Sequence, residues 1–255
     1  MKRKDLYQLL EEQYLYFNQK YFIETDPIQV PHSFSKEKDI EIAGFLAASI
    51  AWGQRPVIIR NANSLLERMD YAPADFVRNS TEKDLEVFNS FKHRTFQAVD
   101  MQFFIRSLQH IYLNHGGLEK AFELGFEQGA KDSLIAFNAL FNTVLHLPRS
   151  EKHLSNPAKN SAAKRINMYL RWMVRKDKRG VDFGLWNKIN SKDIMCPLDV
   201  HSGNVARKLG ILTRKQNDWK ALEEVMFQLK QLDPKDPVKY DFALFGLGVF
   251  ESFGK

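Results

Sequence analysis

Apolar residues recur with the spacing of an α-helix along nearly the whole chain, which constrains its fold more than any other feature. Residues 5–20 predict an amphipathic helix, and residues 40–52 predict a buried one because most of its faces are apolar. No run of alternating polar and apolar residues predicts a strand, and no internal repeat is found. The sequence therefore predicts an all-α protein with about ten helices.

Capping residues and prolines predict where the other helices begin. An Asp or Asn at the N-cap and a proline in the first turn are typical helix starts. They predict helices at 56–69, from Asp100 to Gly116, from Asn156-Pro157 to Arg175, at 199–209, at 218–230 and at 237–249, and the apolar spacing alone predicts two more at 118–126 and 133–145. Thr81 and Asp84 predict one further helix start. The polar, basic stretch 148–160 is the predicted boundary between two lobes of a single unit, 1–255.

Composition narrows the class of partner. The 255 residues include 37 Lys and Arg against 31 Asp and Glu, a net charge of +6, which favours a polyanionic partner. One cysteine, Cys196, excludes an internal disulfide and a cysteine-held metal cluster, and the seven histidines lack metal-binding spacing, so we expect no metal and no cofactor. No apolar run is long enough to span a membrane, and early acidic residues interrupt any signal peptide. We expect a cytoplasmic protein without a membrane partner.

The helix predicted after Pro157 carries polar and basic side chains along one side. This side is formed by Lys164, Asn167, Met168, Arg171 and Arg175. A solvated face of an amphipathic helix explains the pattern. Alternatively, Lys164 is an amine nucleophile in a basic cleft, where neighbouring cations disfavour its charged form.

A second candidate is Asp199, which lies at the predicted start of a short helix and is followed by His201. Asp is a good N-cap, which is a purely structural explanation. A carboxylate at that position also remains ionised, because it faces the positive end of the helix dipole. Such a fixed anion could stabilise a cationic sugar in a transition state. The two interpretations are compatible.

These segments together resemble a known family. Lys164 to Arg175, then Pro197 to His201, then Ala206 to Gly210 are similar to a bacterial family that carries a domain of unknown function, and the resemblance covers most of the chain. That family distantly resembles the helix-hairpin-helix DNA glycosylases, particularly the archaeal 8-oxoguanine type. The shared signature is a lysine on a helix and a later aspartate at a helix start, here 35 residues apart.

The resemblance implies a two-lobed DNA-glycosylase-like architecture and an activity. It implies base flipping, attack by Lys164 on C1′ of the sugar, and a Schiff base, with or without strand cleavage. It makes Asp199 the electrostatic partner and Gln54 a residue that fills the gap left by the flipped base. The glycine-rich hairpin of typical members is absent. Asn156 to Ser161 stands there instead, and Lys159 is expected to assist phosphate binding.

Other residues complete the predicted interface with duplex DNA. Trp172 is a candidate for stacking on an extruded base, and Arg171 and Arg175 are candidates for phosphate contacts. His201 is expected to orient Asp199 or to contact phosphate. Two other function classes remain open: a non-catalytic helical module that binds nucleic acid, and a helical protein that binds a small metabolite.

Overall fold

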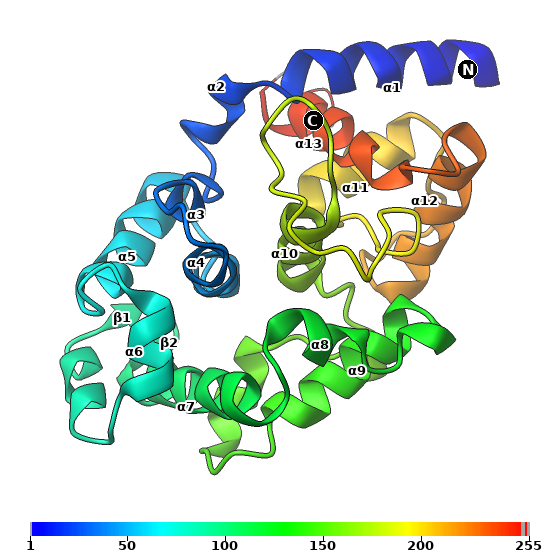
Figure 1. Ribbon diagram of the computed structural model, residues 1–255. Helices are drawn as coiled ribbons and strands as arrows, with labels where there is room; N and C mark the ends of the chain where they lie inside the picture. Colours follow the sequence, from blue (N-terminus) through cyan, green and yellow to red (C-terminus); the bar gives the residue numbers. More distant parts are fainter. Residues whose placement is uncertain (1, 251–252, 254–255) are drawn as a thin grey trace. The chain divides into compact units, whose positions relative to one another are not determined.

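The chain is described by a computed structural model that covers residues 2–250 and 253 (Figure 1). Within these residues, helices are the dominant secondary structure, and the sheet consists of the short antiparallel strands β1 (Lys92–His93) and β2 (Phe96–Gln97). The predicted all-α class is therefore confirmed. No helix among the described residues is long and apolar enough to cross a membrane.

The chain divides into two compact units. We call Met1–Phe22 with Pro157–Lys255 the terminal unit, and Ile23–Asn156 the inserted unit. The chain passes from the terminal unit into the inserted unit between residues 22 and 23, inside the helix α2 (Lys20–Ile23), and the sequence analysis names no boundary there. It returns to the terminal unit between residues 156 and 157, within the stretch 148–160 that the sequence analysis names.

The terminal unit is organised around its last helix. Its elements are α1 (Arg3–Phe17), η4 (Pro157–Lys159), α10 (Lys164–Val174), α11 (Val200–Lys208), α12 (Trp219–Leu232), η5 (Pro237–Tyr240) and α13 (Asp241–Val249). The helix α13, red in Figure 1, packs against both α1 and α11. Two glycines permit this close approach: a Cβ at Gly246 would lie 2.1 Å from the Phe17 ring, and one at Gly248 would lie 3.0 Å from the His201 carbonyl oxygen.

The inserted unit has a core of phenylalanine rings. Its elements are α3 (Gln29–His32), α4 (Glu37–Ser49), α5 (Arg55–Glu67), α6 (Pro73–Asn79), η1 (Asp84–Phe88), β1, β2, α7 (Ala98–Asn114), α8 (Leu118–Glu123), η2 (Phe126–Gln128), α9 (Ala130–Phe141) and η3 (Pro148–His153). Phe45, Phe104 and Phe141 meet with ring centroids 4.9–6.2 Å apart. Helices from distant parts of the sequence therefore share one aromatic core.

The helices expected at Asp100 and after Pro157 start at other residues than predicted. The residue that precedes α7 as its N-cap is Gln97, whereas Asp100 is the third helical residue and closes a capping box by accepting a hydrogen bond from the Gln97 backbone at 2.8 Å. The predicted helix 157–175 begins only at Lys164. Pro157–Lys159 form only the short 3₁₀ helix η4. Asn160 and Ala163 then take positive φ values, which interrupt a right-handed helix before Lys164.

Candidate functional site

The structure brings Lys164 and Asp199 together within the terminal unit. Lys164 is the first residue of α10, and its Nζ lies 3.3 Å from Oδ2 of Asp199. The side chains keep 32% and 19% of their surface exposed. The pair is therefore accessible to a molecule in solution, although 34 residues separate the two in the chain.

The start of α11 fixes the Asp199 carboxylate. Asp199 is the N-cap, and its Oδ1 accepts hydrogen bonds from the backbone amides of His201 at 2.9 Å and Ser202 at 3.0 Å. The Ser202 hydroxyl in turn accepts from the Asp199 backbone at 2.9 Å. One carboxylate oxygen thus anchors the side chain, which leaves Oδ2 to face Lys164.

These contacts keep Asp199 ionised. Burial alone would raise the pKa of this carboxyl, but the Lys164 charge and the hydrogen bond from the Ser202 amide outweigh burial and lower the pKa below its ordinary value. Asp199 is therefore a fixed anion at neutral pH. It is a poor acceptor for the proton that Lys164 would have to lose before acting as a nucleophile.

The backbone before Lys164 is strained. Ala163 has φ of 47° and ψ of 40°, a left-handed conformation that is unfavourable for a residue with a Cβ. Nearby, Ser161 forms an isolated β-bridge with Asp218, which holds this segment against the start of α12. Such strain persists only where surrounding contacts impose it, and it concentrates at functional positions.

The predicted basic face of α10 lies in the interior. Arg171 and Arg175 are 3% and 0% exposed, so they do not form the solvent-facing surface that the sequence predicts. Asp182 joins them, with its two oxygens 3.1 Å from Arg171 Nε and 3.1 Å from Arg175 Nη1. Arg175 also pairs with Asp236 at 3.0 Å. Remote carboxylates cover this side of the helix, which explains the difference.

One carboxylate of this interior network, Asp241, was missed from the sequence. It is the first residue of α13, is 4% exposed and pairs with Arg171. Burial raises its pKa to about 6, Arg171 opposes the rise, and the charges of Asp199 and Lys164 act on it as well. A single Asp followed by a strongly apolar run, Phe242 to Val249, is the sequence signal that points to it.

The other candidates on α10 are buried. Asn167, Met168 and Trp172 are 0%, 8% and 0% exposed. Asn167 donates a hydrogen bond from Nδ2 to the Ala162 carbonyl at 2.9 Å, which ties the helix to the turn before it. Every residue of α10 from Ile166 onward is buried, so this helix is central to the packing of the terminal unit.

The remaining candidates are exposed. Lys159 ends η4, and His201 follows the N-cap of α11, where its charge helps to lower the pKa of Asp199. Gln54 lies in the inserted unit as the N-cap of α5, and its side chain makes no capping hydrogen bond. All three side chains are therefore accessible to solvent.

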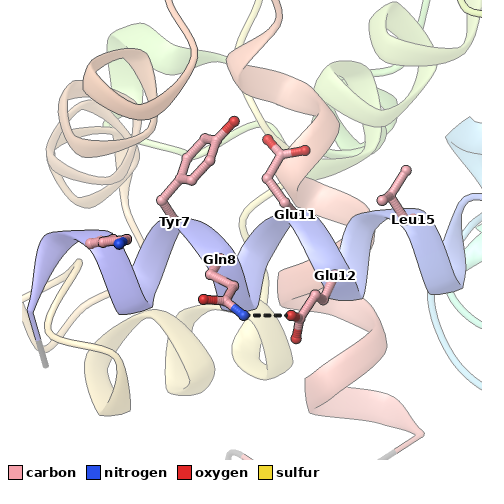
Figure 2. Close-up of a pocket in the computed structure, with 6 residues that line it drawn as sticks. Tyr7, Gln8, Glu11, Glu12 and Leu15 are labelled. Atoms are coloured by element: carbon pink, nitrogen blue, oxygen red, sulfur yellow. Dashed lines mark hydrogen bonds between the residues drawn. The ribbon is translucent and has the colours of Figure 1, made fainter.

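A separate hollow of about 460 Å³ runs along α1 (Figure 2). Tyr7, Glu11 and Leu15 point to one side of the helix, while Gln8 and Glu12 point to the other and share a hydrogen bond of 2.9 Å. All of its lining residues come from this one helix, so few groups converge on a ligand. Among the described residues, no three His, Cys, Asp or Glu side chains gather to hold a metal.

Comparison with known proteins assigns a family. A family profile described as "Protein of unknown function (DUF2400)" matches residues 26–250. The chain belongs to this family. The DUF2400 match includes Lys164, Asp199 and Asp241, and therefore the whole candidate site. No curated protein and no solved structure matches the chain.

Proposed function

We propose that the terminal unit carries the site of a DNA glycosylase that removes a damaged base, such as an oxidised purine. The observation that supports this proposal is the contact of 3.3 Å between an accessible lysine amine and a fixed aspartate anion. A lysine that forms a Schiff base and a carboxylate that stabilises a sugar cation are the two groups that such a reaction requires.

The proposed reaction begins at the glycosidic bond of a flipped nucleotide. The C1′–N bond breaks, and its electron pair leaves with the base, which takes up a proton. The positive charge left on C1′ and the ring oxygen is stabilised by Asp199, whose low pKa keeps it negative. Asp199 therefore acts by its charge rather than as a base.

Lys164 then captures the sugar. Nζ loses one proton, which balances the proton that the departing base takes up, and it donates its lone pair to C1′ to form a C–N bond. The sugar ring then opens at its oxygen, the oxygen takes up a proton from the attached nitrogen, and the C–N bond becomes an imine without loss of water. The strained turn at Ala163, which places Lys164 at the start of α10, fits a requirement for precise placement of the amine.

The distribution of charge supports a polyanionic substrate. The terminal unit holds 23 Lys and Arg against 14 Asp and Glu, a net charge of +9, whereas the inserted unit holds 14 against 17, a net charge of −3. The positive charge of the chain therefore belongs to the unit with Lys164 and Asp199. Phosphate groups of a duplex are attracted to such a unit.

Borohydride trapping tests this proposal. Borohydride reduces an imine to a stable amine, so the protein incubated with duplexes that contain 8-oxoguanine, other lesions or an abasic site should give a covalent protein–DNA band. Lys164→Gln should abolish the band, because the nucleophile is lost. Lys208→Gln, which removes an exposed lysine at the end of α11, should trap like the wild type.

Two outcomes would contradict the proposal. One is the absence of a band with every lesion, and the other is an undiminished band with Lys164→Gln. Binding of DNA with steep salt dependence but no band would favour a non-catalytic nucleic-acid-binding module. Binding of a small molecule without salt dependence would favour a metabolite-binding protein.

A further inference from the structure

Residues 217–219, at the start of α12, contact both sides of the candidate site. On one side they hold the turn that precedes α10. Asp218 forms the bridge with Ser161 and accepts a hydrogen bond from Asn160 Nδ2 at 2.9 Å. The Trp219 backbone amide donates to the Asn160 carbonyl oxygen at 3.1 Å. The turn that leads into α10 is therefore attached to this short segment.

On the other side, Asn217 contacts the backbone of Asp199. Its Nδ2 donates a hydrogen bond to the Asp199 carbonyl oxygen at 2.9 Å. The same oxygen accepts the first hydrogen bond of α11, from the Gly203 amide at 2.9 Å. Because the carboxylate of Asp199 is itself held by the amides at the helix start, both its main chain and its side chain are fixed. Asn217 thus holds the backbone from which the carboxylate reaches Lys164.

The orientation of the Asn217 amide is fixed in turn. Arg207 Nη2 donates to Asn217 Oδ1 at 2.5 Å, and the same guanidinium donates to two backbone carbonyls of the loop before α12, each at 2.8 Å. A guanidinium only donates, so the amide oxygen faces Arg207 and the amide nitrogen faces Asp199. Space is also limited, because a Cβ at Gly203 would lie 2.5 Å from Asn217 Oδ1. The glycine therefore leaves room for this amide.

We propose that Asn217 is a positioning residue, which holds Asp199 beside Lys164 at the separation that adduct formation requires. This inference rests on the function proposed above and adds to the same site a neutral side chain that acts through Asp199. Placement matters because a displacement of about 1 Å at a reacting group can slow a reaction about 100-fold. The segment 217–219 thus holds together two groups that are 35 residues apart in the chain.

Two substitutions disturb the Asn217 amide in different ways. Asn217→Ala removes it. Gly203→Ala retains it but introduces a Cβ 2.5 Å from its oxygen, so the amide has to move. Alanine is otherwise a better helix former than glycine, so α11 should still form in this variant. Asn204→Ala, at an exposed position of the same helix, is the matched control.

The first measurement is the titration of the Asp199 carboxyl carbon by NMR in the protein without DNA. In the wild type, the Lys164 charge helps to lower the pKa of Asp199. Loosening of the pair in Asn217→Ala and Gly203→Ala should move the Asp199 midpoint to higher pH by about 0.5, whereas Asn204→Ala should leave it in place. An unmoved midpoint in Asn217→Ala would overturn the inference. Should that variant fail to fold, Gly203→Ala decides in the same way.

The second measurement is the rate of borohydride trapping, taken beside the affinity for the duplex. Asn217→Ala should slow adduct formation about tenfold or more and leave the affinity unchanged, because the amide acts on a reacting group and not on phosphates. Trapping at the wild-type rate would also overturn the inference. The two proposals fail separately. A shifted midpoint with no adduct from any protein, wild type included, contradicts only the glycosylase proposal, whereas adducts with an unmoved midpoint contradict only the role of Asn217.

Discussion

At the scale of single residues, Asp199 has two roles that different substitutions separate. Its Oδ1 caps α11, and its charged Oδ2 faces Lys164. Asn caps a helix about as well as Asp, whereas Ala does not cap it. Asp199→Ala should lower the free energy of unfolding by about 1 kcal/mol more than Asp199→Asn does. Both variants lose the anion, so both should slow adduct formation by about 100-fold.

Urea unfolding and the rate of trapping measure these two effects on the same samples. The stability contribution of the Asp199 charge is present above the pKa of an unfolded Asp, near 4, and is lost as the pH falls through its lower folded value. Stability should therefore be compared at neutral pH. Full trapping by Asp199→Asn would show that the carboxylate serves only as a cap.

The two arginines of α10 show that residue type alone does not predict which face of a helix is buried. Arg171 and Arg175 share Asp182 in the interior, and Arg171 also lies 4.2 Å from the centroid of the Phe242 ring. A basic stripe on a helix is typical of a solvated or phosphate-binding face. Here Asp182 from the loop after α10 and the distant Asp236 and Asp241 pair with the two arginines, so the same pattern in the sequence forms part of the core.

At the scale of elements, the packing of α13 on α1 depends on the absence of a side chain at Gly246. Replacing glycine with alanine in an unobstructed helix stabilises it by about 1 kcal/mol. At this position the new Cβ would lie 2.1 Å from the buried Phe17 ring, so Gly246→Ala should instead destabilise the protein by about 1–3 kcal/mol. Thermal or urea unfolding measures the change.

A double-mutant cycle tests whether the Phe17 ring is the group that the new Cβ at position 246 would meet. In the Phe17→Ala background the ring is gone, so adding Gly246→Ala should cost little further stability. A stabilising effect of Gly246→Ala in the otherwise unchanged protein would show that α13 and α1 are not packed this closely.

Helix starts show how far the sequence predicts these elements. Asp199 and Asp218 were predicted at the starts of helices, and each caps its helix through its own side chain. Asn156-Pro157 gives an equally good local signal, yet α10 begins at Lys164. Before it, Asn160 and Ala163 take positive φ values, and Ser161 bridges to Asp218, a contact between distant residues that no local pattern contains.

The candidate site was predictable to a similar extent. Lys164 and Asp199 were selected as residue types at suitable positions, and the structure places them 3.3 Å apart. Asp241 was not selected, because the helix predicted at 237–249 starts four residues earlier and gives this Asp no special position. Its significance lies in its burial and in its contact with Arg171, and both arise from tertiary packing.

At the scale of the whole molecule, charge is divided unevenly between the two units. The terminal unit has a net charge of +9 and the inserted unit a net charge of −3, so the overall charge of +6 understates the contrast. A protein that neutralises phosphates releases counterions, and its affinity for DNA falls as salt rises. If the terminal unit binds the duplex, its exposed lysines should determine that salt dependence.

This expectation is tested by fluorescence anisotropy with a labelled duplex between about 50 and 200 mM salt. Lys176 and Lys178, exposed in the terminal unit, are replaced together by Gln, and as a matched control so are Lys92 and Lys131, exposed in the inserted unit. Each lost phosphate contact lowers the slope of log affinity against log salt by about 1, so the first pair should reduce the slope by about 1–2 and the second should leave it unchanged. Equal effects of the two pairs would mean that the duplex is attracted by the net charge of the chain. A larger effect of the second pair would place DNA on the inserted unit, and then the charge of the terminal unit would no longer support a DNA substrate for Lys164 and Asp199.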